Sequence, residues 1–162
     1  MHSQEISIFI PDGSLALQAT QALFLEYAQS LQVDLCFQDF DHELHNLPGE
    51  YSAPRGTLLV ARVNGEWAGC CAMRPLDSSD YSNACEMKRL YVRPQFRGLR
   101  VGRRLAEAVM DAARLAAYDC ILLDTLDDME SARALYEELG FASIPPYYYN
   151  PIAGAHYLKA DL

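Results

Sequence analysis

Seven basic side chains lie close together in one short stretch of this chain, with no carboxylate among them. The stretch runs from Lys88 to Arg104 and reads KRLYVRPQFRGLRVGRR. The whole chain has 13 Lys and Arg residues against 22 Asp and Glu residues, so more than half of its positive charge is gathered here. Such a cluster attracts anions, and the chemistry it predicts is the binding of a phosphorylated ligand.

The elements around this stretch would position it as an anion-binding loop. KRLYV alternates and is rich in β-branched and aromatic residues, which is typical of a strand. After Pro94, Gly98 and Gly102, apolar residues recur at helical spacing, namely Val101, Leu105, Ala108, Val109, Ala112, Leu115 and Ala116. Backbone N–H groups at a helix N-terminus lack intrahelical partners and the helix dipole is positive there, so we expect the phosphate at this helix start.

The spacing of the glycines distinguishes this loop from two other phosphate-binding loops. A mononucleotide P-loop requires G-x-x-x-x-G-K-[ST], but Gly98 and Gly102 are one residue too close and arginines follow them. A dinucleotide fingerprint would follow the first strand of a βαβ unit, whereas this loop lies past mid-chain. The loop resembles the acetyl-CoA pyrophosphate loop, [QR]-x-x-G-x-[GA], of the GCN5-related N-acetyltransferase (GNAT) family and its small bacterial-type members, at Arg97, Gly98, Leu99, Arg100, Val101 and Gly102.

The flanking segments extend the resemblance to roughly residues 57 to 144. CEMKRLYVRP resembles the fourth strand of the family, DCILLDTL the fifth strand, and ESARALYEELGF the helix that comes next. Two positions depart from the family pattern, because Arg100 replaces a usual glycine and Met129 replaces a frequent asparagine. An arginine at this position can adopt a helix-start conformation and adds charge, but it is not expected to take the positive φ angles open to glycine.

The resemblance implies a GNAT-like α/β fold, with a mixed, mostly antiparallel central sheet and a βαβ acetyl-CoA-binding core at about residues 84–141. Acetyl-CoA would be the co-substrate. The backbone of Leu90, Tyr91 and Val92 would hold its pantetheine arm. The loop from Arg97 to Arg103 would hold the pyrophosphate, and Ala132 would contact the cofactor from the next helix. The implied reaction is direct transfer of an acetyl group to a primary amine of a small molecule or a protein terminus.

Moving an acetyl group from a thioester to an amine poses two proton problems. Freeing an alkyl amine at pH 7 costs roughly 4 to 5 kcal/mol, given a pKa near 10.4. The departing thiolate then needs a proton or a local positive charge. The family pattern implies Glu86 as the base and Tyr136 as the acid. Glu86 could instead pair with a neighbouring arginine or cap a sheet edge, and Tyr136 could be a core residue.

Alternation along the strand that carries Glu86 determines which face of the sheet each of its side chains lies on. Glu86, Lys88, Leu90 and Val92 share one face if alternation holds, unless a bulge intervenes, as the family commonly has near this point. Cys85 adjoins Glu86 and should point to the opposite face, which argues against a covalent cysteine mechanism. The five cysteines are odd in number and lack a C-x-x-C pair, so we interpret them as buried free thiols.

Candidate acceptor-binding residues lie in two segments. Asp39 and Glu43, in a region that covers the acceptor cleft in the family, could attract a cationic acceptor. The neighbouring His42 and His45 could hold a metal, but charged helical runs are usually solvated, so no metal is expected. In IPPYYYNP the prolines favour an extended chain with alternate tyrosines facing opposite ways. Its residues Tyr147, Tyr148 and Asn150 could line the acceptor pocket or a subunit interface, which leaves a homodimer open.

Composition sets the remaining expectations. At 162 residues the chain fits one domain, residues 1–162. No apolar run is long enough for a membrane span and no signal peptide is visible, so a cytoplasmic protein is expected without a membrane partner. A net charge of −9 argues against nucleic acid. Two alternatives stay open, a non-catalytic CoA-binding or sensory domain and a transferase for another acyl group.

Two further elements can be predicted. TLLVARV and EWAGCCAMRP flank Asn64-Gly65, which is typical of a hairpin with a two-residue turn. The segment that starts at Ser14 predicts a helix with Leu15, Ala19, Ala22, Leu23 and Tyr27 on one face.

Overall fold

The computed structural model describes residues 5–31, 39–126 and 130–162. Met129 and Cys36 lie outside these ranges. In chain order the elements are β1 (Ile6–Phe9), α1 (Ser14–Ser30), α2 (Phe40–His45), β2 (Thr57–Val63), β3 (Glu66–Pro75), β4 (Ala84–Val92), the 3-10 turn η2 (Pro94–Phe96), α3 (Val101–Leu115), β5 (Cys120–Leu126), α4 (Glu130–Glu138), β6 (Ala142–Ser143) and β7 (Ala155–Asp161).

The strands form one seven-stranded sheet in the order β1-β2-β3-β4-β5-β7-β6. Among the described strands, β4 and β5 make the one parallel pair, and α3 connects them. The other neighbours are antiparallel. The mixed, mostly antiparallel α/β fold with a βαβ unit is therefore confirmed.

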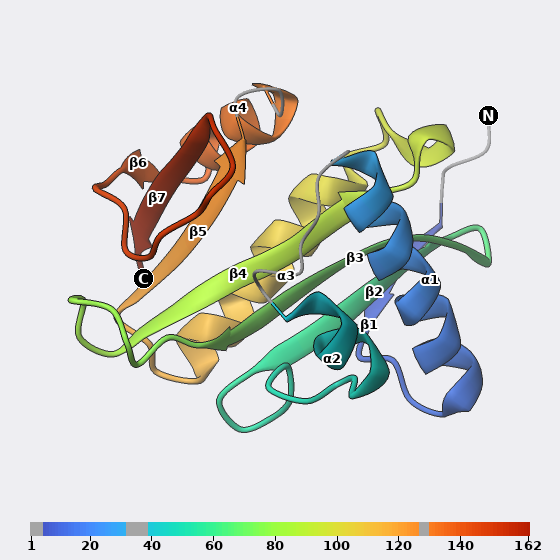
Figure 1. The fold of residues 1–162 in the computed structure, drawn as a ribbon. Coiled ribbons are helices and arrows are strands. Elements are labelled where there is room, and N and C mark those ends of the chain that lie inside the picture. Colours follow the sequence, from blue (N-terminus) through green and yellow to red (C-terminus); the bar gives the residue numbers. More distant parts are fainter. Residues whose placement is uncertain (1–4, 32–38, 127–129) are drawn as a thin grey trace.

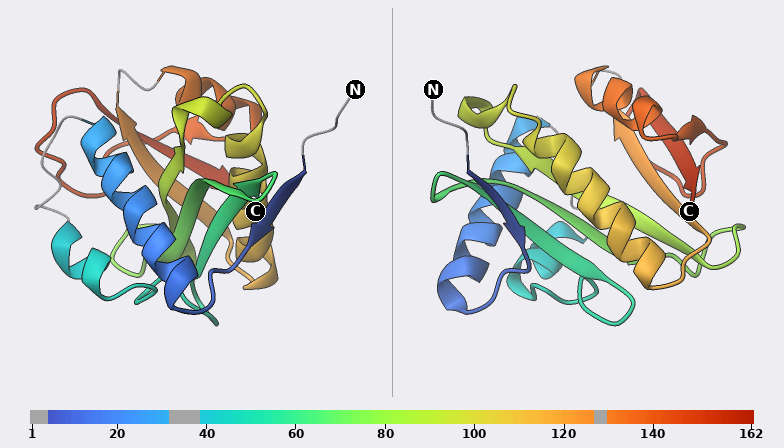
Figure 2. Two further views of the ribbon diagram at one scale, coloured as in Figure 1. Left: turned by 90° about the vertical axis from the view of Figure 1, so that its right-hand side faces the viewer. Right: turned by 180° about the vertical axis from the view of Figure 1, so that it is seen from behind.

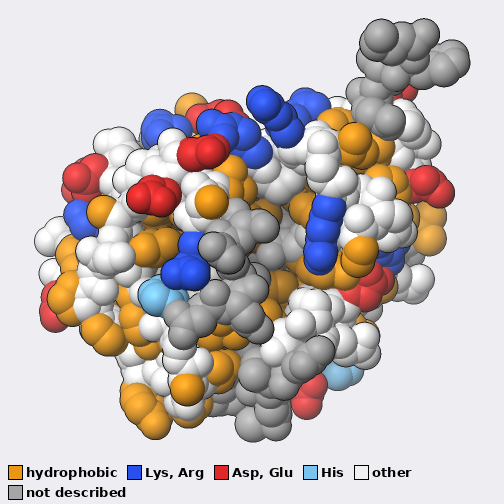
Figure 3. Space-filling model, turned by 90° about the horizontal axis from the view of Figure 1, so that it is seen from above, with side chains coloured by type: hydrophobic (Ala, Val, Ile, Leu, Met, Phe, Trp, Pro, Cys, Tyr) orange, Lys and Arg blue, Asp and Glu red, His pale blue; other side chains and the backbone are white. Residues whose placement is uncertain are grey.

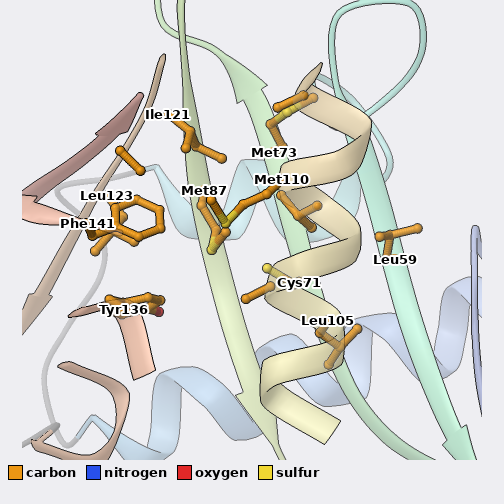
Figure 4. Close-up of a cluster of buried hydrophobic side chains, with 14 of the residues drawn as sticks. Leu59, Cys71, Met73, Met87, Leu105, Met110, Ile121, Leu123, Tyr136 and Phe141 are labelled. Carbon is orange, nitrogen blue, oxygen red and sulfur yellow. The ribbon is translucent and has the colours of Figure 1, made fainter. Parts of the chain in front are cut away.

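Helices cover both faces of the sheet (Figure 2). α1 and α2 lie on one face, and α3 crosses the other face over the central strands (Figure 1). The larger core lies between the sheet and α3, and it extends to Tyr136 of α4 and to Phe141 (Figure 4). A second core packs Leu23 and Phe24 of α1 and Phe40 of α2 against the opposite face. The central strands are thus buried on both sides.

The predicted hairpin is confirmed. β2 and β3 pair antiparallel around a turn in which both residues have positive φ, 51° at Asn64 and 85° at Gly65. A type I′ turn needs this conformation at both central positions, and Asn-Gly adopts it at low cost.

The buried faces of the two long helices differ from the predicted ones. α1 buries Ala16, Thr20, Leu23 and Phe24, whereas Leu15 is 75% exposed. α3 buries Val101, Leu105, Ala106, Val109, Met110 and Ala113, whereas Leu115 is 90% exposed. Leu23 of α1 and Val101, Leu105 and Val109 of α3 belong both to the apolar spacing in the sequence and to the buried faces, so the two sets overlap in part. No helix in the described ranges is both long and apolar enough to cross a membrane.

Candidate active site

The sheet opens between its two central parallel strands. β4 and β5 are paired only where Ala84, Cys85 and Glu86 face Cys120, Ile121 and Leu122. Beyond these residues the strands diverge, and β5 tilts away with β7 and β6 (Figure 1). From Met87 onward β4 keeps its pairing with β3 alone. Two connected grooves occupy the opening, and they share Tyr27, Leu31 and Leu90 in their walls.

The outer groove lies beside the end of β4 and the start of α3. Its walls come from Leu90, Tyr91 and Val92, from the last turns of α1 and from α4, and its floor is the basic loop. Nine of the residues predicted to bind the cofactor line it, namely Leu90, Tyr91, Val92, Arg97, Gly98, Arg100, Val101, Gly102 and Ala132. Figure 3 views this end of the molecule and shows Lys and Arg side chains gathered on it.

Two predicted cofactor residues have other contacts. Leu99 packs against the large core. Arg103 forms ion pairs with Glu107, 3.0 Å away, and with Glu138 of α4, 2.7 Å away. The Arg103 side chain therefore connects α3 to α4. Neither Leu99 nor Arg103 lines the outer groove.

The backbone of the basic loop differs from the expectation at Arg100. Arg100 is the N-cap of α3 and has φ 65° and ψ 23°, the left-handed conformation that glycine usually supplies. The expectation that an arginine would not take a positive φ here was wrong. Gly98 also has positive φ, 87°, and a Cβ added there would meet nothing within 4 Å. The loop thus opens the first turn of α3 to an anion.

The inner groove lies deeper in the same opening and contains the predicted acid. It is lined by Met87, Lys88 and Leu90 of β4, by Leu123, Asp124 and Thr125 of β5, and by Tyr136 of α4. Tyr136 packs edge to face on Phe141, with ring centroids 5.6 Å apart (Figure 4). Within the described part of the chain its hydroxyl makes no hydrogen bond. Burial raises the pKa of Tyr136 well above its ordinary value, which keeps the proton on the hydroxyl.

A bulge in β4 sets which side chains face the grooves. Cys70 pairs with Tyr91 and Ala72 with Lys88, so Arg89 and Leu90 together stand opposite Cys71. Arg89 has φ 63°, and the extra residue reverses the facing of the side chains that come after it on the strand. Leu90 and Val92 pack on the α3 side, together with Cys85 and Met87, and no longer share a face with Glu86. The alternation was therefore wrong from Leu90 onward, and the alternative of a bulge is confirmed.

Glu86 is buried in a network of its own. It is 1% exposed and lines neither groove. The Arg74 guanidinium donates to its Oε1 at 2.9 Å, and the Tyr147 hydroxyl donates to its Oε2 at 2.7 Å. Both carboxylate oxygens are thus held by neighbours. The contact with Arg74 is the pairing with a neighbouring arginine that the sequence analysis gave as an alternative to a catalytic role.

Glu43 is engaged by Arg89. The guanidinium donates two hydrogen bonds to the carboxylate, at 2.8 and 2.9 Å, and lies over the ring of Phe40. Tyr51 donates to the same carboxylate at 2.8 Å. Burial alone would raise the pKa of Glu43, but the hydrogen bonds and charge of Arg89 outweigh burial and lower it. Asp39 is exposed and lies beside Glu43 at the wall of another depression, with His42 and Glu50.

Two of the three consecutive tyrosines turn inward. Tyr147 bonds to Glu86, and the Tyr148 hydroxyl donates a short hydrogen bond to Oδ2 of Asp124. Their rings lie 5.4 Å apart and both pack on Tyr157 of β7, whereas Tyr149 is 84% exposed. The expected alternation of facing therefore fails between Tyr147 and Tyr148. Asn150 donates to Asp124 at 3.0 Å and lines the inner groove.

Several groove residues were not among the predicted site residues, and three of them carry polar side chains that matter below. Lys88, Asp124 and Thr125 all line the inner groove. Burial lowers the pKa of Lys88, and the charges of Glu86 and Asp124 partly oppose that shift. The signal for Asp124 was its place near the end of an otherwise apolar strand, CILLDTL, beside the strand that carries Glu86.

Cysteine and metal chemistry have no support in the described residues. Cys85 packs in the α3-side core, away from Glu86, and burial raises the pKa of its thiol to about 12. Cys70, Cys71 and Cys120 are likewise free and buried. His, Cys, Asp and Glu side chains of the described ranges do not gather in threes around a point that could hold a metal ion.

Comparisons with known proteins agree with this geometry. Residues 18–141 match the family described as "Acetyltransferase (GNAT) family". The chain is 40% identical over 163 residues to an "Uncharacterized N-acetyltransferase" of Schizosaccharomyces pombe, and the match covers 100% of this chain and 98% of the relative.

Solved structures share the fold. A crystal structure of an acetyltransferase from Streptococcus agalactiae superposes with a TM-score of 0.78 at 22% identity, covering 97% of this chain and 98% of that one. A putative acetyltransferase from Salmonella typhimurium, solved with its cofactor acetyl-CoA, superposes with a TM-score of 0.71 at 18% identity, covering 97% and 94%. At these identities the likeness concerns the fold.

Proposed function

The chain belongs to the acetyltransferase (GNAT) family, and on that premise we propose that it transfers the acetyl group of acetyl-CoA directly to a primary amine of a small molecule or a protein terminus. It is an acetyl-CoA-dependent acyltransferase by the same family membership. The observation that carries the proposal is the continuous opening between β4 and β5, with a basic helix start in its outer part and Tyr136 in its inner part.

The outer groove suits the charged end of the cofactor. Gly98 and Arg100 leave the first turn of α3 open to a diphosphate, and Arg97 and Arg100 add charge at the same wall. The backbone N–H and C=O groups of β4 beyond Met87 have no strand partner on the β5 side. They can therefore pair with the amide groups of a pantetheine arm, much as a strand would.

The inner groove suits the transfer itself. With pantetheine along Leu90 to Val92, the thioester would lie beside Tyr136, because Leu90 belongs to both grooves. The Tyr136 hydroxyl would donate to the sulfur as the thiolate departs. Glu86 would take the proton of the amine, which requires Tyr147 to yield its place at Oε2 or to relay the proton.

The experiment that tests this function is a panel of primary amines and peptide N-termini, each incubated with the protein and acetyl-CoA. We expect amine-dependent release of the CoA thiol and an acetylated product by mass spectrometry. Parallel reactions with propionyl-CoA would show whether a longer acyl group is preferred.

The proposal would be contradicted if the protein bound acetyl-CoA but released no CoA thiol with any amine or peptide of the panel. That outcome would favour the non-catalytic CoA-binding domain, because such a domain needs the basic helix start but not Tyr136. Titration calorimetry with acetyl-CoA separates the two cases, since it measures binding alone.

A further inference from the structure

Two carboxylates lie on one face of the sheet at the point where it opens. Glu86 pairs with Leu122 in the last register position that joins β4 and β5. Asp124 comes two residues after Leu122, so its side chain lies on the same face as those of Leu122 and Glu86. One carboxylate is therefore at the junction of the strands and the other is just beyond it.

Of these two carboxylates, Asp124 is the one in the groove. It is only partly buried and lines the inner groove together with Tyr136, Leu90 and Thr125. Glu86 is fully buried and lines no groove. The Asp124 charge also raises the pKa of Tyr136, after the larger effect of burial, which places the two groups within electrostatic range of each other.

The Asp124 carboxylate is held in one orientation by the segment before β7. Tyr148 and Asn150 both donate to Oδ2, and the Tyr157 hydroxyl braces the segment by donating to the Tyr148 carbonyl at 3.1 Å. Among the described residues, no hydrogen bond reaches Oδ1. A carboxylate fixed through one oxygen presents the other to a donor without further ordering, which favours binding.

Few charged groups of the described residues lie around Asp124. Lys88 lies across the groove on β4, and the two attract each other without a contact short enough for an ion pair between them. Arg89 is engaged by Glu43, and Arg74 by Glu86 and Glu50. Among the residues that the structure describes, Asp124 is thus the carboxylate that lines the inner groove.

We propose that Asp124 binds the ammonium group of the acceptor amine through Oδ1 and so determines that cationic primary amines are accepted. This inference rests on the proposed function. The acceptor nitrogen, held at Asp124, would lie between that carboxylate and the thioester beside Tyr136. Tyr148 and Asn150 act as positioning residues, because they hold the carboxylate and leave the substrate contact to it.

The test compares wild type with Asp124→Asn, which keeps the shape of the side chain but removes its charge. Two acceptors with the same carbon skeleton and different basicity serve as probes, ethylamine, which is cationic at pH 7, and trifluoroethylamine, which is mainly uncharged. Each is measured as a substrate, or as a competitive inhibitor of the best amine of the panel. Asp119→Asn, which changes an exposed aspartate immediately before the same strand, is the matched control.

We expect Asp124→Asn to weaken the apparent affinity for ethylamine at least about tenfold, since hydrogen bonds to charged groups are worth about 1.5–3 kcal/mol. Affinity for trifluoroethylamine and for acetyl-CoA should stay within about twofold of wild type. Asp124→Glu, which retains the charge, should recover part of the preference for ethylamine. Asp119→Asn should match wild type throughout.

Two results would overturn the inference while leaving the function intact. One is an unchanged affinity for ethylamine in an Asp124→Asn protein that still binds acetyl-CoA. The other is an equal loss with both amines, because that would mean a structural role for Asp124. Failure of the wild-type protein to acetylate any amine would overturn the proposed function itself, and the inference with it.

Discussion

Arg74 and Glu86 join neighbouring strands through a hydrogen bond of 2.9 Å between Nε and Oε1. Arg74 also contacts Glu50 at 3.0 Å, so the guanidinium bridges two carboxylates. Tyr147 donates to the remaining oxygen of Glu86. Both oxygens of the carboxylate that the sequence analysis named as the base are therefore hydrogen-bonded. The pH dependence of activity can distinguish a role of Glu86 as a base from a purely structural role.

Glu86→Gln should preserve acetyl-CoA binding and remove most activity near neutral pH. The amide can still contact Arg74 and Tyr147, but it cannot take a proton from the acceptor. Raising the pH supplies free amine, so the deficit in kcat should shrink toward about pH 9 to 10. Rate profiles between pH 6 and 10 measure this. A deficit that does not change with pH would mean that Glu86 acts only through the Arg74 pair.

Gly98→Asp should raise the dissociation constant for acetyl-CoA at least about tenfold, because a unit charge about 4 Å from a phosphate costs about 1 to 4 kcal/mol in a solvated site. Gly65→Asp is a matched control, since both glycines have similar positive φ, 87° and 85°, and open space around an added Cβ. Calorimetry should show a loss of affinity at Gly98 alone. Equal affinities for the two folded variants would refute the assignment of the outer groove to the pyrophosphate.

Tyr136→Phe should lower kcat by about a hundredfold or more while acetyl-CoA affinity stays nearly unchanged. The hydroxyl makes no hydrogen bond within the described part of the chain, so its removal should hardly alter stability. Single-turnover kinetics isolate the chemical step. If kcat fell less than about threefold with chemistry rate-limiting, Tyr136 would be a packing residue against Phe141.

Arg100→Gly and Arg100→Ala should have similar acetyl-CoA affinities but different stabilities. Both remove the same cation, yet only glycine adopts φ 65° without strain, so the glycine variant should be more stable by about 1 kcal/mol. At Arg104, inside α3, the order should reverse by about 1 kcal/mol, because glycine disfavours a helix interior. Urea unfolding measures both pairs. The same order at both positions would contradict a left-handed Arg100.

Glu43→Gln should destabilise the fold at pH 7 by about 3–5 kcal/mol, because it removes the carboxylate that forms an ion pair with the buried Arg89 guanidinium. The folded pKa of Glu43 is lowered, so its stabilisation is present above the ordinary carboxyl pKa and is lost as pH falls through the folded pKa. The difference between wild type and variant should therefore shrink below about pH 4.

Asp77→Asn is the control for that prediction. Asp77 is exposed, and its contact with Arg55 is an exposed ion pair. Its removal should change stability little at any pH. Denaturant unfolding at pH 7 and pH 3 measures both variants, and equal effects of the two substitutions would rule out a special role for the buried pair.

The sequence predicted what local chemistry determines. The residue types of Asn64 and Gly65 are enough to predict the turn between β2 and β3. The succession of strand, basic loop and helix from Lys88 to Leu115 can likewise be recognised from residues that are adjacent in the chain. It could not reveal contacts made by chain segments far apart. Tyr148 meets Asp124 across 24 residues, and Arg89 meets Glu43 across 46. The preference of positive φ angles for glycine also failed as a guide at Arg100. The surrounding loop and helix start can hold an arginine in the left-handed conformation at modest cost.

The opening between β4 and β5 also affects how the protein meets other copies of itself. A strand with an unpaired edge usually offers a template on which another molecule can add a strand, and proteins protect such edges. Here the two unpaired edges face each other across the grooves, with residues of α1 and α4 at the rim. A strand of another molecule would have to enter the grooves between β4 and β5 to pair with either edge. The narrow separation of β4 and β5 would thus keep these two inner edges from adding a strand of another molecule.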